Sequence, residues 1–164
     1  HLGHRPLRAP VDLSAAGDSL PPAQPRLRLA VLTCMDARID PLGALGLSPG
    51  DAHVLRNAGG IVDEGAIRSL VISQRMLGTR EVLVVQHTRC GMIGLDDEAF
   101  ARDVERDSGR RPPWAAGGFA DLDESVRRSV AALRAEPLLP HRDRVRGAAL
   151  DLATGILREV TPAL

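Results

Sequence analysis

Two runs of consecutive apolar residues constrain the fold of this 164-residue chain more than any other feature of its sequence. The first, residues 27–34, reads L-R-L-A-V-L-T-C and is apolar at nearly every position after Arg28. The second, residues 81–86, reads E-V-L-V-V-Q and is the clearest strand signal in the chain. Runs without polar alternation are typical of strands that are buried on both faces, as in parallel sheets.

Segments in which apolar residues recur at helical spacing separate these predicted strands. A helix is predicted to begin after the capping residue Asp63, to run to Leu77 and to stop at Gly78. Two further helices are predicted over about residues 96–107 and 122–133. Strands that alternate with helices in this way indicate an α/β fold, with a central, mostly parallel β-sheet flanked by helices.

Shorter predicted strands and a proline-rich N-terminal segment define the bounds of the predicted domain. A short strand is expected over residues 52–55, and the end of the chain suggests a strand, a turn and a further strand in A-A-L-D-L, A-T-G and I-L-R-E-V. Residues 1–26 lack any such pattern and contain three prolines between positions 21 and 25. We therefore expect an N-terminal arm or linker over residues 1–26 and a single domain over residues 27–164.

Charge and composition exclude several classes of function. Basic and acidic residues number 21 each, so the formal net charge is zero and nothing steers the chain toward DNA, RNA or an anionic membrane. Aromatic residues make up 2%, which leaves no stacking platform for single-stranded nucleic acid. The sequence contains neither a membrane-spanning apolar run nor the apolar stretch of a secretory signal. The given sequence begins at His1 and not at Met. We expect a cytoplasmic protein with no nucleic-acid or membrane partner.

A thiol, a carboxylate and a guanidinium lie close together at the end of the first predicted strand. The motif C-M-D-A-R places Cys34, Asp36 and Arg38 at alternate positions, so in an extended chain their side chains point to the same side. The carboxyl ends of the strands are where open α/β sheets bind ligands. We therefore expect these three side chains to belong to a functional site.

A histidine and a second cysteine directly follow the strand predicted over residues 81–86. In H-T-R-C-G, His87 and Cys90 stand three residues apart, at the sheet edge where Cys34 is also expected. Two sulfurs and one ring nitrogen suit zinc, and three protein ligands leave a fourth position open, as in catalytic zinc sites. The sequence thus predicts one Zn²⁺ per chain, bound by Cys34, His87 and Cys90.

Simpler interpretations of these residues compete with zinc binding. An isolated buried cysteine is usually an inert core residue, and two cysteines can form a disulfide, which is uncommon inside cells. Asp36 and Arg38 can form a surface salt bridge of little energetic value. His53 is more typical of a core histidine than of a ligand, and R-N-A-G-G at residues 56–60 is weak evidence for a close backbone approach. The joint placement of the ligand candidates at two strand ends favours zinc.

In order and spacing, C-M-D-A-R at 34, R-N-A-G at 56 and H-x-x-C-G at 87 resemble the β-class carbonic anhydrases. The stretch I-R-S-L-V-I-S-Q-R-M-L-G-T-R-E is similar to that family as well, and the shorter prokaryotic subgroup fits best, over roughly residues 27–160. The resemblance implies a zinc lyase with Asp36 and Arg38 beside the metal. It also implies a homodimer or a larger homo-oligomer with the metal near the subunit interface.

The implied reaction is the reversible hydration of carbon dioxide to bicarbonate. Zinc lowers the pKa of its bound water, and the resulting zinc-bound hydroxide attacks carbon dioxide. We expect Asp36 to accept a hydrogen bond from that hydroxide and Arg38 to keep Asp36 ionised. Asp36 is also close enough in sequence to Cys34 to become a fourth zinc ligand in a closed state.

Two alternative functions stay open. One alternative is that the same site hydrolyses carbonyl sulfide or carbon disulfide, which are linear molecules like carbon dioxide. A non-catalytic, zinc-stabilised binding protein is the other alternative, and the Asp36–Arg38 pair argues against it. Gln86 and Arg89 differ from residues that relatives often carry at these positions, which leaves the substrate preference undecided.

Overall fold

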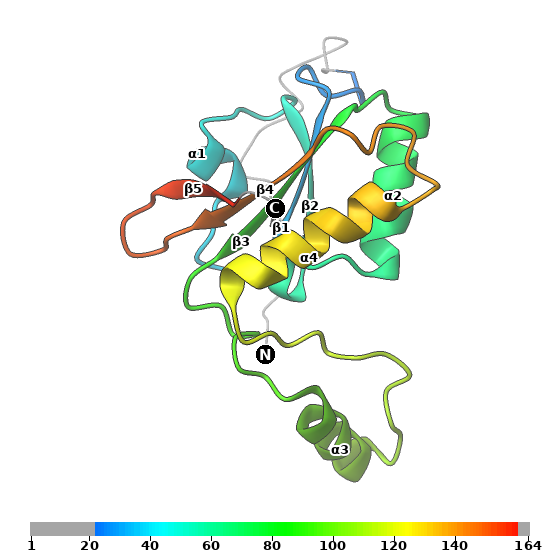
Figure 1. Ribbon diagram of the computed structural model, residues 1–164, viewed down its shortest axis with the longest axis vertical. Helices are drawn as coiled ribbons and strands as arrows, with labels where there is room; N and C mark the ends of the chain where they lie inside the picture. The colour runs from blue at the N-terminus through cyan, green and yellow to red at the C-terminus, as the bar shows by residue number, and fades with distance from the viewer. Residues whose placement is uncertain (1–21, 161–164) are drawn as a thin grey trace, which may run out of the picture.

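The apolar runs predicted as buried strands form the centre of one β-sheet (Figure 1). The computed structural model describes residues 22–160, so most of the predicted arm, residues 1–21, lies outside the described part, and the division at residue 26 stays a prediction. Within residues 22–160 the strands are β1 (Leu29–Cys34), β2 (Ala52–Asn57), β3 (Glu81–His87), β4 (Val145–Leu150) and β5 (Leu157–Val160).

The order of the strands puts the two predicted ligand-bearing strands side by side. The sheet has the order β2-β1-β3-β4-β5, in which β5 alone among the described strands runs antiparallel to its neighbour. In the register, Val31 of β1 pairs with Val54 of β2 and with Leu83 of β3. The carboxyl ends of β1 and β3 therefore meet at one edge of the sheet. The α/β fold with a mostly parallel sheet is confirmed.

Three of the helices begin at an aspartate that caps them. The Asp63, Asp96 and Asp121 side chains each accept a hydrogen bond from a backbone N–H in the first turn of the helix that follows. The helices and the single 3₁₀ turn of the described residues are α1 (Pro41–Leu45), η2 (Ala58–Gly60), α2 (Glu64–Arg75), α3 (Asp97–Ser108) and α4 (Leu122–Ala135). The sequence analysis did not predict α1, which is one turn long and buries none of its side chains.

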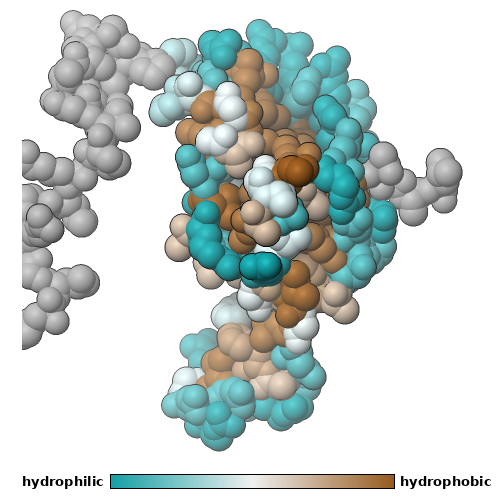
Figure 2. All heavy atoms as spheres, turned by 90° about the vertical axis from the view of Figure 1, so that its left-hand side faces the viewer, coloured by the Kyte–Doolittle hydropathy of each residue, from teal (hydrophilic) through white to brown (hydrophobic). Residues whose placement is uncertain are grey.

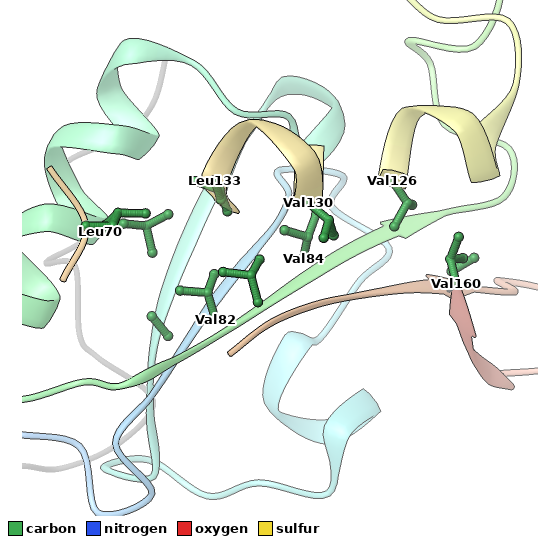
Figure 3. Packing of buried hydrophobic residues seen from close by; sticks show 11 residues of the cluster. Leu70, Val82, Val84, Val126, Val130, Leu133 and Val160 are labelled. Carbon is green, nitrogen blue, oxygen red and sulfur yellow. The ribbon is translucent and has the colours of Figure 1, made fainter. Parts of the chain in front are cut away.

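Helices α2 and α4 cover one face of the sheet and enclose the larger of two cores (Figures 1 and 3). Leu70 of α2 and Leu133 of α4 are fully buried there, against Val82 and Val84 of β3. A second cluster lies on the other face and includes Val31, Val85 and Leu150, together with both cysteines. Strands β1 and β3 are therefore covered on both faces, as their apolar sequences predicted. No helix in the described part has the length and apolar character to span a membrane.

Helix α3 stands away from the rest of the molecule (Figure 1). It belongs to a projection, residues 95–118, whose base is closed by an isolated bridge between Ile93 and Phe119. Of the helix itself, only Ala101 is buried. We call residues 95–118 the α3 projection.

Candidate metal centre

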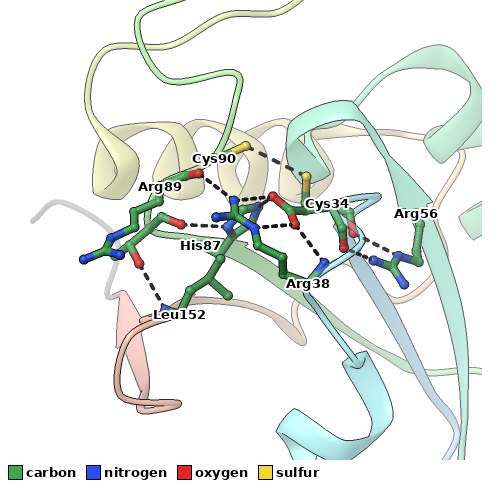
Figure 4. A network of polar contacts seen from close by, with 9 residues as sticks. Cys34, Arg38, Arg56, His87, Arg89, Cys90 and Leu152 are labelled. Carbon is green, nitrogen blue, oxygen red and sulfur yellow. Dashed lines mark hydrogen bonds and ion pairs between the residues drawn. The ribbon is translucent and has the colours of Figure 1, made fainter.

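Three potential metal ligands converge where β1 and β3 end (Figure 4). Cys34 is the last residue of β1 and His87 the last of β3, while Cys90 follows in the turn after β3. All three are buried, and the ligand atoms of the three side chains lie within 4.8 Å of one another. The two Sγ atoms are 3.8 Å apart. The structure thus brings together the three residues predicted as metal ligands, which we call the ligand cluster.

His87 is held in the tautomer that a metal ligand requires. Its Nδ1 lies 2.8 Å from the carbonyl oxygen of Thr88, and because a carbonyl can only accept, Nδ1 carries the proton. The Nε2 lone pair is then free to bind a cation. This atom is fully buried and has no hydrogen-bond partner among the described residues. A buried nitrogen without a partner is unfavourable unless something binds it.

This donor set fits Zn²⁺. Two sulfurs and an unpartnered imidazole nitrogen are the borderline-soft ligands that zinc prefers, and three of them leave room for a fourth. Burial raises the pKa of the Cys90 thiol, and the neighbouring Cys34 raises it further. A cation at the ligand cluster would reverse this effect, because it stabilises the thiolate.

Asp36 and Arg38 form a tight pair beside the ligand cluster. The Arg38 guanidinium donates to both carboxylate oxygens, with Nε 2.9 Å from Oδ1 and Nη2 2.7 Å from Oδ2. The Arg38 backbone N–H donates to Oδ1 as well. These hydrogen bonds hold the pKa of the Asp36 carboxyl well below its usual range, so it is ionised at neutral pH.

The Asp36 carboxylate faces the ligand cluster. Its Oδ2 lies 3.8 Å from Nε2 of His87. The Asp36 side chain is only 15% exposed, whereas that of Arg38 is 56% exposed. A carboxylate this close to the cluster is well placed to accept a hydrogen bond from a small molecule bound there.

Arg38 also connects the two loops of the site. Its Nη2 donates to the carbonyl oxygen of Arg89, 2.9 Å away, in the turn between His87 and Cys90. Arg89 adopts a left-handed backbone conformation, with φ of 56°, which is unusual for a residue other than glycine. Its backbone rather than its side chain makes this contact with Arg38.

Gly60 provides the close backbone approach that R-N-A-G-G suggested. A Cβ at this position would lie 2.9 Å from the backbone N of Cys34, and the residue has φ of +62°. Only glycine can therefore let the 3₁₀ turn after β2 pass this near the end of β1.

Two residues that the sequence analysis did not single out as site residues support the ligand-bearing loops. Arg56 donates from Nε to the carbonyl of Cys34 at 2.9 Å and from Nη2 to that of Asp36 at 2.6 Å. The Thr88 hydroxyl accepts from the backbone N–H of Leu152 in the β4–β5 turn, at 3.0 Å. The two Arg56 contacts and the Thr88–Leu152 contact all involve main-chain atoms, which have no residue-type signature in a sequence.

The remaining histidines of the described residues lie outside the ligand cluster. His53 is half-buried and contacts the Ser73 hydroxyl and the Ala23 carbonyl, in agreement with a structural histidine. Gln86 is fully buried and donates to the Gly60 carbonyl at 3.3 Å, so its amide serves the packing behind the site.

Known proteins resemble this chain in both sequence and structure. A family model described as carbonic anhydrase matches residues 29–114. Beta-carbonic anhydrase 1 of Mycobacterium tuberculosis is 44% identical over 141 residues, which span 86% of each chain. The crystal structure of a carbonic anhydrase from Streptococcus mutans is 42% identical and superposes with a TM-score of 0.83 over 90% of both chains. A carbon disulfide hydrolase of Acidianus sp. is 35% identical over 80% of this chain and 76% of its own.

Proposed function

The chain belongs to the β-carbonic anhydrase family, and from this premise we propose that it catalyses the reversible hydration of carbon dioxide to bicarbonate at the Cys34, His87 and Cys90 cluster. It is a lyase acting on a small-molecule substrate. The observation that carries the proposal is the unpartnered Nε2 of buried His87, which faces two thiols and an ionised carboxylate.

The ligand cluster is the proposed binding place for one Zn²⁺ per chain. The family depends on zinc, and the donor set of two Sγ atoms and Nε2 suits this metal. When bound, zinc supplies a Lewis acid that makes water a nucleophile near neutral pH. His87 binds through Nε2 because the Thr88 carbonyl holds the proton on Nδ1.

Asp36 and Arg38 are the proposed catalytic residues. Asp36, ionised at neutral pH, accepts a hydrogen bond from the attacking water and so directs its lone pair toward carbon dioxide. Arg38 fixes both carboxylate oxygens and thereby the orientation of Asp36. We also propose a closed state in which Asp36 is the fourth ligand; the 3.8 Å between its Oδ2 and His87 Nε2 supports this idea.

Hydrolysis of carbon disulfide is the second candidate, because relatives of that name are 34–41% identical to this chain. Carbon dioxide is preferred as substrate because the β-carbonic anhydrase relative is more similar, at 44% over most of both chains. Stopped-flow measurement of both rates on the same zinc-loaded preparation decides between the two. We expect carbon dioxide to have the higher kcat/KM, and a higher value for carbon disulfide would reverse the assignment.

We further propose that the chain forms a homodimer or a larger homo-oligomer. The α3 projection extends from the body with little of its surface buried, and Trp114 within it is 61% exposed. Figure 2 shows apolar surface in brown on the body and continuing onto this projection. A second copy of the chain is a partner that can cover such a surface.

A further inference from the structure

Arg56 makes two short hydrogen bonds that the proposed mechanism does not use. Its Nε and Nη2 donate to the carbonyls of Cys34 and Asp36, at 2.9 and 2.6 Å. These two carbonyls flank the residue at which the chain leaves β1 and turns toward Arg38. One guanidinium therefore holds both sides of the turn that carries a metal ligand and the proposed catalytic carboxylate (Figure 4).

The support comes from a neighbouring strand, not from the loop itself. Arg56 lies on β2, where its backbone is in register with Thr33 of β1. The pairing of β1 with β2 continues as far as the N–H of Met35, which donates to the Asn57 carbonyl at 2.8 Å. Beyond Met35, no strand in the described part of the chain pairs with this segment. The hydrogen bond from the Arg56 side chain to the Asp36 carbonyl attaches one more residue of this segment to β2.

Arg38 and Arg56 act on different parts of Asp36. Arg38 binds the carboxylate and links it to the carbonyl of Arg89. Arg56 binds the Asp36 main chain, from which the side chain projects. The guanidinium is planar and rigid, so two occupied donors define the spacing of the two carbonyls. A lysine has a single charged nitrogen, so it cannot hold two donor nitrogens at the fixed separation of Nε and Nη2.

We propose that Arg56 is a positioning residue of this site: it fixes the main chain of residues 34–36 so that the Asp36 carboxylate keeps its place beside the ligand cluster. The role in catalysis rests on the proposed carbon dioxide hydration, whereas the positioning itself does not. The two hydrogen bonds of Arg56 go to main-chain carbonyls, so the proposed role is exerted through the position of Asp36.

Amide hydrogen exchange tests the positioning without any turnover. The N–H of Ile39 donates to the Asp36 carbonyl, and the N–H of Arg38 donates to the Asp36 carboxylate. In zinc-loaded Arg56→Ala, NMR should show both amides exchanging on the order of tenfold faster than in the wild type. The amide of Leu32, inside β1, should exchange at its wild-type rate. Unchanged rates at both Arg38 and Ile39 would overturn the proposal.

Kinetics test the consequence for catalysis. In Arg56→Ala we expect kcat to fall roughly 10- to 100-fold, KM to change little, and zinc content to stay near one per chain. Arg56→Lys should recover part of the lost kcat. The control is Arg75→Ala, which also removes a guanidinium bound to a backbone carbonyl, that of Leu138, remote from the site. It should keep wild-type kcat.

The outcomes separate this proposal from the proposed function. A wild-type chain without carbon dioxide hydration would refute the function, while the exchange measurement would still decide whether Arg56 positions the turn. Zinc lost from Arg56→Ala, or a kcat within about twofold of the wild type, would overturn the positioning role. An equal fall in kcat in Arg75→Ala would overturn it too, because the effect would then be a general loss of stability.

Discussion

Arg38 joins the two loops of the site through its guanidinium. It binds the Asp36 carboxylate with two donors and the Arg89 carbonyl with one. Within residues 22–160, none of its hydrogen bonds is to an atom of the ligand cluster. Its removal should therefore affect the carboxylate while the metal ligands stay in place.

Arg38→Ala should separate metal binding from catalysis. We expect zinc content to stay near one per chain and the carbon dioxide hydration rate to fall about 100-fold, because Asp36 loses its orientation and is free to move toward the ligand cluster. Elemental analysis and stopped-flow rates from about pH 6.5 to 9 measure both quantities. A variant with nearly normal rates across this range would show that the Asp36–Arg38 pair is not catalytic.

Among single residues, the sequence analysis identified those whose side chains are of a type that binds metal. Cys34, His87 and Cys90 stand at strand ends with a spacing that suits metal binding, and the structure brings them together. Their role as ligands stays a prediction until metal is measured. Arg56 could not be assigned in this way, because its partners are backbone carbonyls of residues that are far away in the sequence.

At the level of elements, the end of β1 depends on the 3₁₀ turn that passes against it. Gly60 in this turn combines a positive φ with a contact at which a Cβ would overlap the backbone of Cys34 and Thr33. Gly78, after α2, also has a positive φ, of +74°, but no atom lies within 4 Å of its virtual Cβ. The two glycines thus differ only in the space around them.

Gly60→Ala should destabilise the protein by about 3 kcal/mol, since it combines left-handed strain with overlap at the backbone of β1. Gly78→Ala should cost about 1 kcal/mol, because it has only the strain. Urea unfolding measures both, and Gly60→Ala should also bind less zinc. Equal losses in the two variants would contradict the close approach at Gly60.

An ion pair between Asp123 of α4 and Arg158 joins this helix to the edge strand β5. Both carboxylate oxygens accept from the guanidinium, at 2.7 and 3.1 Å, and these bonds hold the pKa of Asp123 below its usual range. Since the folded-state pKa lies below the value of about 3.9 for the unfolded chain, the pair stabilises the fold above that pH. Its contribution is lost as pH falls through the folded-state pKa.

Asp123→Asn should therefore lower the free energy of unfolding at pH 6 by no more than about 1 kcal/mol, as both groups are partly exposed. At about pH 3 the difference from the wild type should shrink. Arg158→Gln removes the other partner, so its difference in free energy of unfolding from the wild type should shrink with falling pH in the same way. Denaturant unfolding at several pH values measures these differences, and a gap that widens on acidification would contradict the assignment.

Elements proved predictable where their periodicity is strong. The strands at residues 27–34 and 81–86 and the helix after Asp63 are observed with ends shifted by at most two residues. The helix α1 escaped prediction because one turn with no buried side chain leaves no periodic pattern. The separation of α3 from the body is a tertiary feature, so its amphipathic sequence could not reveal it.

At the level of the whole molecule, the α3 projection predicts association between copies of the chain. Light scattering at micromolar concentration should give at least twice the 17.5 kDa mass of one chain. Trp114→Ala should weaken association, because Trp114 is a large apolar side chain on the projection. Met76→Ala, which changes another exposed apolar residue, after α2, serves as the control. A fully active 17.5 kDa monomer would refute the oligomer.

Cys34, His87 and Cys90 are proposed to hold the zinc at which carbon dioxide is hydrated. Zinc content and hydration rate, measured on the same preparations of the wild type and of Cys90→Ala, test this proposal most directly. We expect about one zinc per wild-type chain and rapid hydration, and we expect Cys90→Ala to lose most of both. A Cys90→Ala protein that still carries about one zinc per chain, or a zinc-loaded wild type that does not hydrate carbon dioxide, would contradict the account.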